Sequence, residues 1–399
     1  MPNSLGALLL EPALSGCDWS VIYGGGSSEN FAFPESNATY WQASLPLIDA
    51  AGTAVRIDGR FPDARFFSVS LYNSSYQLQG TLHDCSLATN TPDANPYANK
   101  TQLKPGASRS GAAYTAYVVF GSPPPRPVPN TLYVPPQLGA GGASLPSVQQ
   151  LYLLYRVYRP AGPTASGGVP LPTLSINGAP FSGDTSALYC QNLSSLLAQS
   201  ILYSIPLTPG QAATSAPTNP AFALYKDSGV PGQDAGVNGD NQYMSASATL
   251  PAGYLYLVRG KAPTYTGSPQ YAGNRPADVR YWSVCQNTSL SLEVIACVGD
   301  FQATLDTDGY YNIVVTGDMT PPAYARGFNW MPFGSRSPAT VIYRQLLAAD
   351  HFSGASGSPT MGAYTPQLAY CKVSEFQALA TAYRGSPKQV FTGCGGSAN

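Results

Sequence analysis

Arg65-Phe66-Phe67-Ser68-Val69-Ser70-Leu71-Tyr72 is the stretch that decides how this chain folds. Phe67, Val69 and Leu71 are apolar and alternate with serines, and this period of two predicts a strand with one buried face. A second version, Arg280-Tyr281-Trp282-Ser283-Val284-Cys285, alternates in the same way in the second half of the chain. The sequence therefore predicts two related β-rich lobes.

Further short matches recur in the same order on both sides of the chain, which indicates an internal duplication. Between them stand Gly, Pro, Asn and Asp signals typical of turns, such as the hairpin signal Asp58-Gly59. The matches are Tyr117-Val118-Val119-Phe120-Gly121 with Ile313-Val314-Val315-Thr316-Gly317, Asn130-Thr131-Leu132-Tyr133 with Asn329-Trp330-Met331-Pro332, Leu154-Tyr155-Arg156-Val157 with Ile342-Tyr343-Arg344-Gln345, and Tyr189-Cys190-Gln191-Asn192 with Tyr370-Cys371-Lys372-Val373, each of the last pair before a helix-like run.

The predicted fold is mainly β, with two tandem, internally duplicated β-sandwich (jelly-roll-like) lobes and a few short helices. An apolar extension occupies 1–20, the first lobe 21–204 and the second lobe 271–399. The stretch 205–270 is rich in Pro, Gly and Tyr and is predicted to be a long connection that is functional or forms an interface.

The surface implied by the composition is almost without ionic groups. Charged residues make up 10% of the 399 residues, against about 25% in typical soluble domains. The formal net charge of -1 offers no basic field for nucleic acid or an anionic membrane. No apolar run reaches the roughly 20 residues that span a bilayer. Gly 40, Pro 37 and Tyr 27 are all high, as in secreted β proteins and cell-surface material.

The seven cysteines include no C-x-x-C pair, which disfavours a zinc site and favours disulfides. Cys285 and Cys297 lie close enough in sequence to bridge adjacent strands. Cys17–Cys85 is the corresponding bond expected in the first lobe, and Cys371–Cys394 is expected to fix the C-terminal tail. Cys190 is then left over, as a buried thiol by default.

Glycan attachment is expected at several places. N-x-S/T sequons occur at Asn37, Asn73, Asn99, Asn192 and Asn287. The proline run Ser122-Pro123-Pro124-Pro125 resembles the hydroxyproline-glycosylated motifs of plant and green-algal wall proteins, which implies possible O-glycosylation there. Met1–Leu14 lacks the basic n-region and the cleavage site of a signal peptide. Either the true signal has been removed from this numbering, or the start is an ordinary structural segment. The first interpretation is preferred, because the rest of the sequence is typical of a secreted protein.

The N-terminal extension is apolar and uncharged, so it is costly to expose. It is expected either to pack on its own body or to add to a sheet edge, whether its own or that of a neighbouring molecule. The side chains that would carry such an assembly contact are Leu5, Leu8, Leu9, Leu10 and Leu14.

No group of residues in the sequence makes a convincing catalytic or metal site. His83-Asp84-Cys85 contains an acid, an imidazole and a sulfur, but adjacent strand residues point to opposite faces and do not converge as a triad does. His351 is typical of a surface histidine at a strand end. Asp306-Thr307-Asp308-Gly309 lacks the closing glutamate of a calcium loop and favours a turn. We expect no enzyme activity and no cofactor.

About half of the chain resembles a known family. Gly59-Arg60-Phe61-Pro62-Asp63-Ala64-Arg65-Phe66 and Gly168-Val169-Pro170-Leu171-Pro172 are similar to proteins built from domains of unknown function 1254 and 1214. Arg280-Tyr281-Trp282-Ser283 and Asp308-Gly309-Tyr310-Tyr311 carry the match in the second half. The resemblance implies tandem β-sandwich lobes without established catalytic chemistry.

Together these observations favour a secreted, glycosylated structural protein. We expect a subunit that self-assembles into an extracellular filament or cell-surface layer by N-terminal strand exchange, with itself and covalent glycans as partners. An extracellular carbohydrate-binding module that uses Tyr and Trp platforms is the alternative.

Overall fold

The chain is mainly β and contains four sheets in two lobes. The computed structural model describes residues 19, 21–24, 30–45, 54–73, 76–92, 94–101, 111–134, 151–180, 217–224, 236–271, 273, 275–289, 291–335, 337–352 and 361–397. The first lobe takes its described residues from Met1–Glu29, Asn37–Gln199 and Val230–Asp240, and the second from Asn30–Ser36, Ser200–Gly229 and Asn241–Asn399.

The first lobe is a sandwich of two five-stranded sheets with strand orders β1-β2-β8-β4-β5 and β10-β9-β3-β6-β7. All pairs are antiparallel except β6 with β7, which is parallel. The strands are β1 (Val21–Gly24), β2 (Ala38–Leu45), β3 (Ala54–Arg60), β4 (Ala64–Tyr72), β5 (Leu78–His83), β6 (Ala113–Phe120), β7 (Thr131–Val134), β8 (Leu151–Pro160), β9 (Thr173–Ile176) and β10 (Ala179–Pro180).

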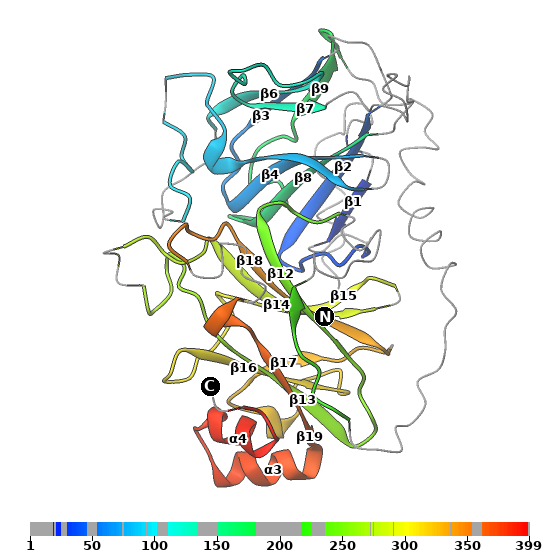
Figure 1. Ribbon diagram of the computed structural model, residues 1–399, viewed down its shortest axis with the longest axis vertical. Coiled ribbons are helices and arrows are strands. Elements are labelled where there is room, and N and C mark those ends of the chain that lie inside the picture. The colour runs from blue at the N-terminus through cyan, green and yellow to red at the C-terminus, as the bar shows by residue number, and fades with distance from the viewer. Residues whose placement is uncertain are drawn as a thin grey trace. The chain divides into compact units, whose positions relative to one another are not determined.

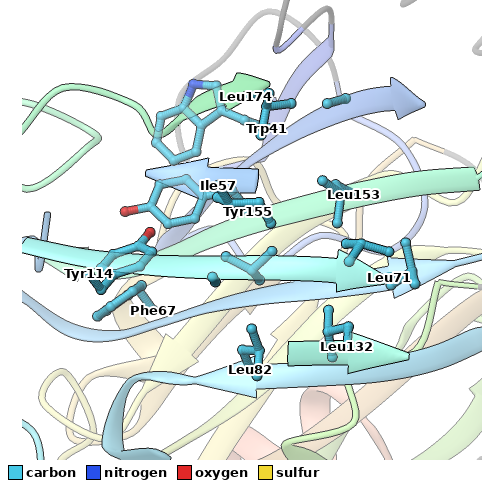
Figure 2. Close-up of a cluster of buried hydrophobic side chains, with 14 of the residues drawn as sticks. Trp41, Ile57, Phe67, Leu71, Leu82, Tyr114, Leu132, Leu153, Tyr155 and Leu174 are labelled. Carbon is cyan, nitrogen blue, oxygen red and sulfur yellow. The ribbon is translucent and has the colours of Figure 1, made fainter. Parts of the chain in front are cut away.

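The core of the first lobe lies between these sheets and confirms the predicted organising strand. Phe67, Val69 and Leu71 of β4 are fully buried and belong to one apolar cluster with Tyr155 of β8. Ile57 enters the same cluster from the other sheet, so the two inner faces interdigitate (Figure 2). The alternation read in the sequence is therefore the burial pattern of a sandwich strand.

The second lobe repeats this architecture with strand orders β11-β12-β18-β14-β15 and β17-β16-β13-β19. Two helices, α3 (Val373–Ala382) and α4 (Pro387–Gly393), follow β19 and pack against the outer face of the second of these sheets (Figure 1). The strands are β11 (Ala223–Leu224), β12 (Asn241–Ala248), β13 (Tyr254–Lys261), β14 (Tyr281–Thr288), β15 (Val294–Gly299), β16 (Tyr310–Thr316), β17 (Asn329–Pro332), β18 (Ala339–Leu346) and β19 (Gln367–Lys372).

Residue-by-residue pairing shows that the lobes are copies of one design. Ser68 of β4 lies opposite Arg156 of β8, and Ser283 of β14 lies opposite Arg344 of β18. The parallel edge pair also recurs, as β6 with β7 and as β16 with β17. The two sheets of each lobe thus have matching strand positions.

A glycine under a tyrosine marks the same place in both lobes. Gly59 pairs with Tyr114 and Gly260 pairs with Tyr311, and in each case a Cβ on the glycine would collide with the tyrosine ring. The predicted Asp58-Gly59 hairpin is therefore wrong, because β3 continues through Gly59 to pass beneath the ring, and β3 and β4 belong to different sheets.

Tyr114 and Tyr311 also correct the alignment of the repeats. Because these two residues are equivalent, Tyr117 corresponds to Val314 and not to Ile313. A shift of one residue exchanges the two faces of a strand, so this difference decides which side chains reach the core.

The stretch 205–270 is not simply a connection, because it contains β12 and β13 of the second lobe. The buried positions of β12 are Met244, Ala246 and Ala248. Because alanine is only weakly apolar, these positions contrast little with the serines between them, and the sequence shows no clear alternation. Strand β13 is buried on both faces, with Tyr256 in the core between the sheets and Leu257 beneath the helices. A strand buried on both sides lacks alternation, which is why the sequence pattern missed it.

Each lobe also contains a short segment, neither helix nor strand, that is not contiguous with its strands in the sequence. We call residues 236–240 the first strap, which belongs to the first lobe, and Asn30–Ser36 the second strap, which belongs to the second lobe. The guanidinium of Arg156 donates to the carbonyl of Gly236 at 3.3 Å. The equivalent Arg344 donates to the carbonyl of Phe33 at 2.6 Å. The repeated arginines are thus buried, 1% and 4% exposed, and hold the straps.

Candidate functional site

Two of the three predicted disulfides are present. Cys285 and Cys297 form a cross-strand bond between β14 and β15. Cys371 and Cys394 join β19 to the end of α4. Both bonds were expected from their spacing and from the position of the tail.

The predicted Cys17–Cys85 bond is wrong, because Cys85 is a free, half-buried thiol. Cys85 follows β5 in a single turn of 3-10 helix, Asp84–Ser86. The position equivalent to the second-lobe disulfide is instead a hydrogen bond of 3.0 Å between the hydroxyls of Ser70 and Thr81. Cys17 and Cys190 lie outside the described residues.

His83, the last residue of β5, contacts a carboxylate that the sequence did not foresee. Its Nδ1 lies 3.0 Å from Oδ1 of Asp240, the last residue of the first strap. The hydrogen bond with Asp240 foremost, and then the neighbouring Cys85, raise the pKa of His83 to about 10. The imidazole is therefore protonated at neutral pH.

Asp84 takes no part in this cluster, as the strand geometry predicted. Its side chain is fully buried and accepts a hydrogen bond from the backbone N–H of Phe67 at 3.2 Å. The carboxylate beside His83 comes instead from Asp240, far along the chain. Sequence reasoning had no signal for that partner, since Asp240 is adjacent to His83 only after the strap has docked.

A buried carboxylate stands beside the Cys285–Cys297 bond in the second lobe. Glu35 of the second strap is fully buried and accepts hydrogen bonds from the hydroxyls of Tyr281 and Ser283. Its Oε2 lies 3.2 Å from Sγ of Cys285 and 3.9 Å from Nη1 of Arg344. The atoms of Glu35, Cys285 and Cys297 that could coordinate a metal ion lie within 4.8 Å of one another. Both sulfurs are bonded to each other, so neither is a thiolate that could bind a metal.

The described sequons differ in accessibility. Asn287 is fully buried, and its side-chain amide donates to the carbonyls of Cys285 and Thr340 at 3.1 and 3.0 Å. A glycan has no room there, so the prediction at Asn287 is wrong for the folded protein. Asn73 is 9% exposed and its amide donates to Gln77.

The remaining predicted modification and assembly residues are either exposed or outside the described residues. Asn37 is half-buried and Asn99 is exposed. Ser122, Pro123, Pro124 and Pro125 lie in an exposed loop between β6 and β7. Asn192, Leu5, Leu8, Leu9, Leu10 and Leu14 lie outside the described residues, so the predictions on them stay predictions.

The other groups considered in the sequence have structural partners. Nε2 of His351, whose side chain is 40% exposed, lies 3.4 Å from Oδ1 of Asp278. The segment from Asp306 to Gly309 forms a turn before β16, as expected. Asp306 accepts a hydrogen bond from Nη1 of Arg259 at 2.5 Å.

A shallow hollow of about 510 Å³ opens on the second lobe. Tyr254, Tyr324 and Asp318 line it together with Thr316, and the Tyr324 hydroxyl donates to Oδ2 of Asp318 at 2.9 Å. Burial, and then the neighbouring carboxylate, raise the pKa of Tyr324 to about 12. The hollow thus presents two tyrosine side chains and the carboxyl group of Asp318.

Comparison with known proteins gives the fold and no function. No family model and no curated protein matches the chain. The crystal structure of an uncharacterised protein from Burkholderia cenocepacia is similar over 92% of this chain and 86% of its own, with a TM-score of 0.51 and 16% identity. A protein structure from Vibrio parahaemolyticus covers 87% of this chain and 90% of its own, with a TM-score of 0.37 and 12% identity. Among the described residues, no helix is long and apolar enough to cross a membrane.

Proposed function

We propose that this protein is a secreted, glycosylated structural subunit that associates with its own copies in an extracellular filament or cell-surface layer. The observation that carries the proposal is the pair of straps: each lobe includes a segment, neither helix nor strand, that is held by a buried arginine. A lobe built to bind such a segment accepts an equivalent one from a second copy at little cost, as in domain swapping.

Several of the strap contacts are made by the main chain of the strap, which suits segment exchange. The N–H of Gly236 donates to the carbonyl of Tyr76 at 2.9 Å, and the hydroxyl of Tyr72 donates to the carbonyl of Val237 at 2.6 Å. In the second lobe the N–H of Phe33 donates to the carbonyl of Leu292 at 2.7 Å. Main-chain hydrogen bonds of this kind also hold segments that are exchanged between copies of a chain.

Surface chemistry supports association through edges rather than through broad apolar patches. Among the described residues the large exposed hydrophobics are few and separate in sequence: Val128, Phe301, Met319 and Tyr383. Strand β1 is an outermost strand of its sheet and directly follows the apolar extension 1–20. The two disulfides agree with an oxidising, extracellular compartment.

Deletion of residues 1–16 tests the exchange mechanism. The protein is secreted from a eukaryotic host and analysed by analytical ultracentrifugation and electron microscopy. We expect assemblies from the full chain and monomers from the deletion. A Leu8→Lys/Leu10→Lys variant should behave like the deletion, because alternate residues of an added strand would share one face. Asn3→Lys, which lies before the apolar segment and would fall on the opposite face, serves as the control.

The outcomes separate two ideas. Undiminished assembly of the deletion would remove the N-terminal mechanism and leave other segments as donors. A full-length chain that remains monomeric at high concentration would remove the structural-subunit proposal itself.

The hollow on the second lobe favours a second candidate function, carbohydrate binding. Its volume lies within the roughly 300–1,000 Å³ of small-ligand sites, and tyrosine faces with a nearby carboxylate suit the apolar faces and hydroxyls of sugars. A glycan-binding screen of the secreted protein tests this, with Tyr324→Ala and Asp318→Asn as site variants. Tyr383→Ala, at an exposed tyrosine outside the hollow, is the matched control. Absence of binding by the native protein would reject the alternative.

A further inference from the structure

We propose that the first lobe binds a small monovalent anion beside Arg156, at the position that the carboxylate of Glu35 occupies in the second lobe. Chloride and a short carboxylate such as acetate share the charge and the acceptor atoms that this site requires. The inference goes beyond the proposed self-assembly and does not depend on it.

Arg156 is a buried cation that forms no ion pair with any described residue. It is 1% exposed. Its Nη1 donates to the hydroxyl of Ser70 at 2.8 Å, and its Nη2 donates to the hydroxyl of Tyr72 at 2.6 Å and to the carbonyl of Gly236 at 3.3 Å. Its Nε is buried and has no hydrogen-bond partner in the described part of the chain. A buried charge is costly unless an opposite charge and further hydrogen bonds offset it.

The second lobe supplies the opposite charge from its own chain. Nη1 of Arg344, the counterpart of Arg156, lies 3.9 Å from Oε2 of Glu35. Ser283 lies directly opposite Arg344 in the sheet, and its hydroxyl donates to the same oxygen. A guanidinium and a serine hydroxyl thus face one buried carboxylate.

The serine of this arrangement is present in the first lobe without its acceptor. Ser68 lies directly opposite Arg156, which is the position of Ser283 relative to its own arginine. The hydroxyl of Ser68 is buried and has no hydrogen-bond partner within the ranges that the structure describes. Directly opposed residues of paired strands share one face of the sheet. An anion at this place would accept from both buried donors and neutralise the arginine.

The two lobes differ at one residue of the strap. The carbonyls held by the two arginines belong to Phe33 and Gly236, and both residues have a left-handed backbone, with φ of 51° and 75°. Two residues further on, the second strap has Glu35 and the first strap has Asn238. Asn238 is 2% exposed, and its amide is neutral. The first strap therefore brings no charge to the position of Glu35.

The rest of the first strap also leaves the arginine open to an ion. Its acidic residue, Asp240, is engaged elsewhere, with Oδ1 3.0 Å from Nδ1 of His83. Gly236 is half-buried, and a Cβ there would meet no described atom within 4 Å. A small ion can approach the guanidinium where the second strap carries the side chain of Phe33.

Thermal unfolding of the full-length secreted protein tests the site. The protein is transferred to chloride-free buffer in which sodium gluconate, a bulky anion, maintains the ionic strength, and chloride then replaces gluconate up to about 150 mM. An anion that binds only the folded state raises the unfolding midpoint. We expect a rise of about 3 °C. A midpoint that does not respond to chloride would overturn the proposal.

A matched pair of variants at residue 238 assigns the response to this site. Asn238→Glu places a carboxylate where the second lobe has Glu35, so this variant should lose the chloride response. Asn238→Gln has the same length without the charge and should keep the response. A response that survives in Asn238→Glu, or that is lost equally in both variants, would reject the site.

Ser68→Ala separates anion binding from a merely structural role of the serine. Because the hydroxyl has no partner within the described ranges, we expect the midpoint in chloride-free buffer to stay within about 1 °C of the native value. The rise caused by chloride should fall by about half or more, since one donor to the anion is lost. A rise equal to that of the native protein would contradict the proposed site.

Acetate, titrated in the same way, distinguishes the two sources of the anion. A rise with chloride and none with acetate would assign a halide site. An equal or larger rise with acetate would assign a site for a small carboxylate, as the position of Glu35 in the second lobe suggests. Asn238→Glu must remove the response in either case.

Discussion

Ser70 and Thr81 share a hydrogen bond of 3.0 Å at the position that Cys285 and Cys297 occupy in the second lobe. The pairing is the same in both sheets, because Ser70 lies opposite Thr81 across β4 and β5 as Cys285 lies opposite Cys297 across β14 and β15. One cross-strand position is thus closed by hydroxyls in one copy and by a covalent bond in the other. The two copies differ in how much an oxidising environment contributes to their stability.

Removal of the second-lobe bond should therefore be costly. For the Cys285→Ala/Cys297→Ala variant we expect a loss of roughly 3 kcal/mol in unfolding free energy, the loop-closure value for a loop of about this size. Urea unfolding followed by near-ultraviolet circular dichroism measures it. Cys85→Ala is the control, since it breaks no bond. An unchanged midpoint would show that the bond does not constrain the unfolded chain.

The two glycines beneath tyrosine rings should not tolerate a side chain. We expect Gly59→Ala and Gly260→Ala each to destabilise the protein by about 2 kcal/mol, because the new methyl group would overpack the site. Gly317→Ala is the matched control, since its Cβ would meet only Leu250, at an ordinary 3.6 Å. Thermal unfolding compares the three variants. An equal loss of stability in all three variants would contradict the steric contact between these glycines and the tyrosine rings.

Acid should weaken the second lobe through Asp306. Burial alone would raise the pKa of its carboxyl, but hydrogen bonds from Arg259, the N–H of Tyr310 and Asn312 hold the pKa below its usual value. A lowered pKa contributes stability that is present above the unfolded-state value, about 3.9, and is lost as the pH falls through the folded value.

The Asp306→Asn variant tests this sign. At pH 7 it should be less stable by about 3 kcal/mol, because Arg259 is left buried without its charged partner. The difference from the native protein should shrink toward pH 2, measured by urea midpoints at both pH values. A difference that is independent of pH would show that the carboxylate charge is not what matters.

Glycan occupancy should follow accessibility rather than the sequon pattern. In protein secreted from a eukaryotic host we expect modification at Asn99 and Asn37 and none at Asn287, whose amide is buried and doubly hydrogen-bonded. Enzymatic deglycosylation in ¹⁸O-labelled water with peptide mass spectrometry measures each site. Full occupancy at Asn287 would contradict this fold around β14.

Much of the fold could be predicted, and the misses have physical causes. The strand from Phe67 to Leu71 was predictable because one face is buried and the other is not, so alternation is visible. Strand β13 was missed because both of its faces are buried, and β12 because alanines fill its buried positions. The disulfide between Cys285 and Cys297 followed from their spacing. A bond was expected at Cys85 by analogy between the lobes, but the first-lobe counterpart of that disulfide is the hydrogen bond between Ser70 and Thr81.

The candidate sites were less predictable than the fold. His83 and Cys85 were visible as a pair in the sequence, and Asp84 was correctly rejected as their partner. Asp240 could not be named, because no local pattern connects it to β5. The hollow beside Tyr324 likewise joins residues from separate loops.

By itself the sequence determined a mainly β chain with a duplicated body, few charges and cysteines suited to disulfides, because periodicity, composition and spacing are local properties that no distant contact alters. Only the tertiary structure decided which segment completes each lobe and which carboxylate meets His83. Those outcomes depend on two straps that contact residues far from them in the sequence. The straps are held by buried arginines whose partners come together only once the sheets have formed.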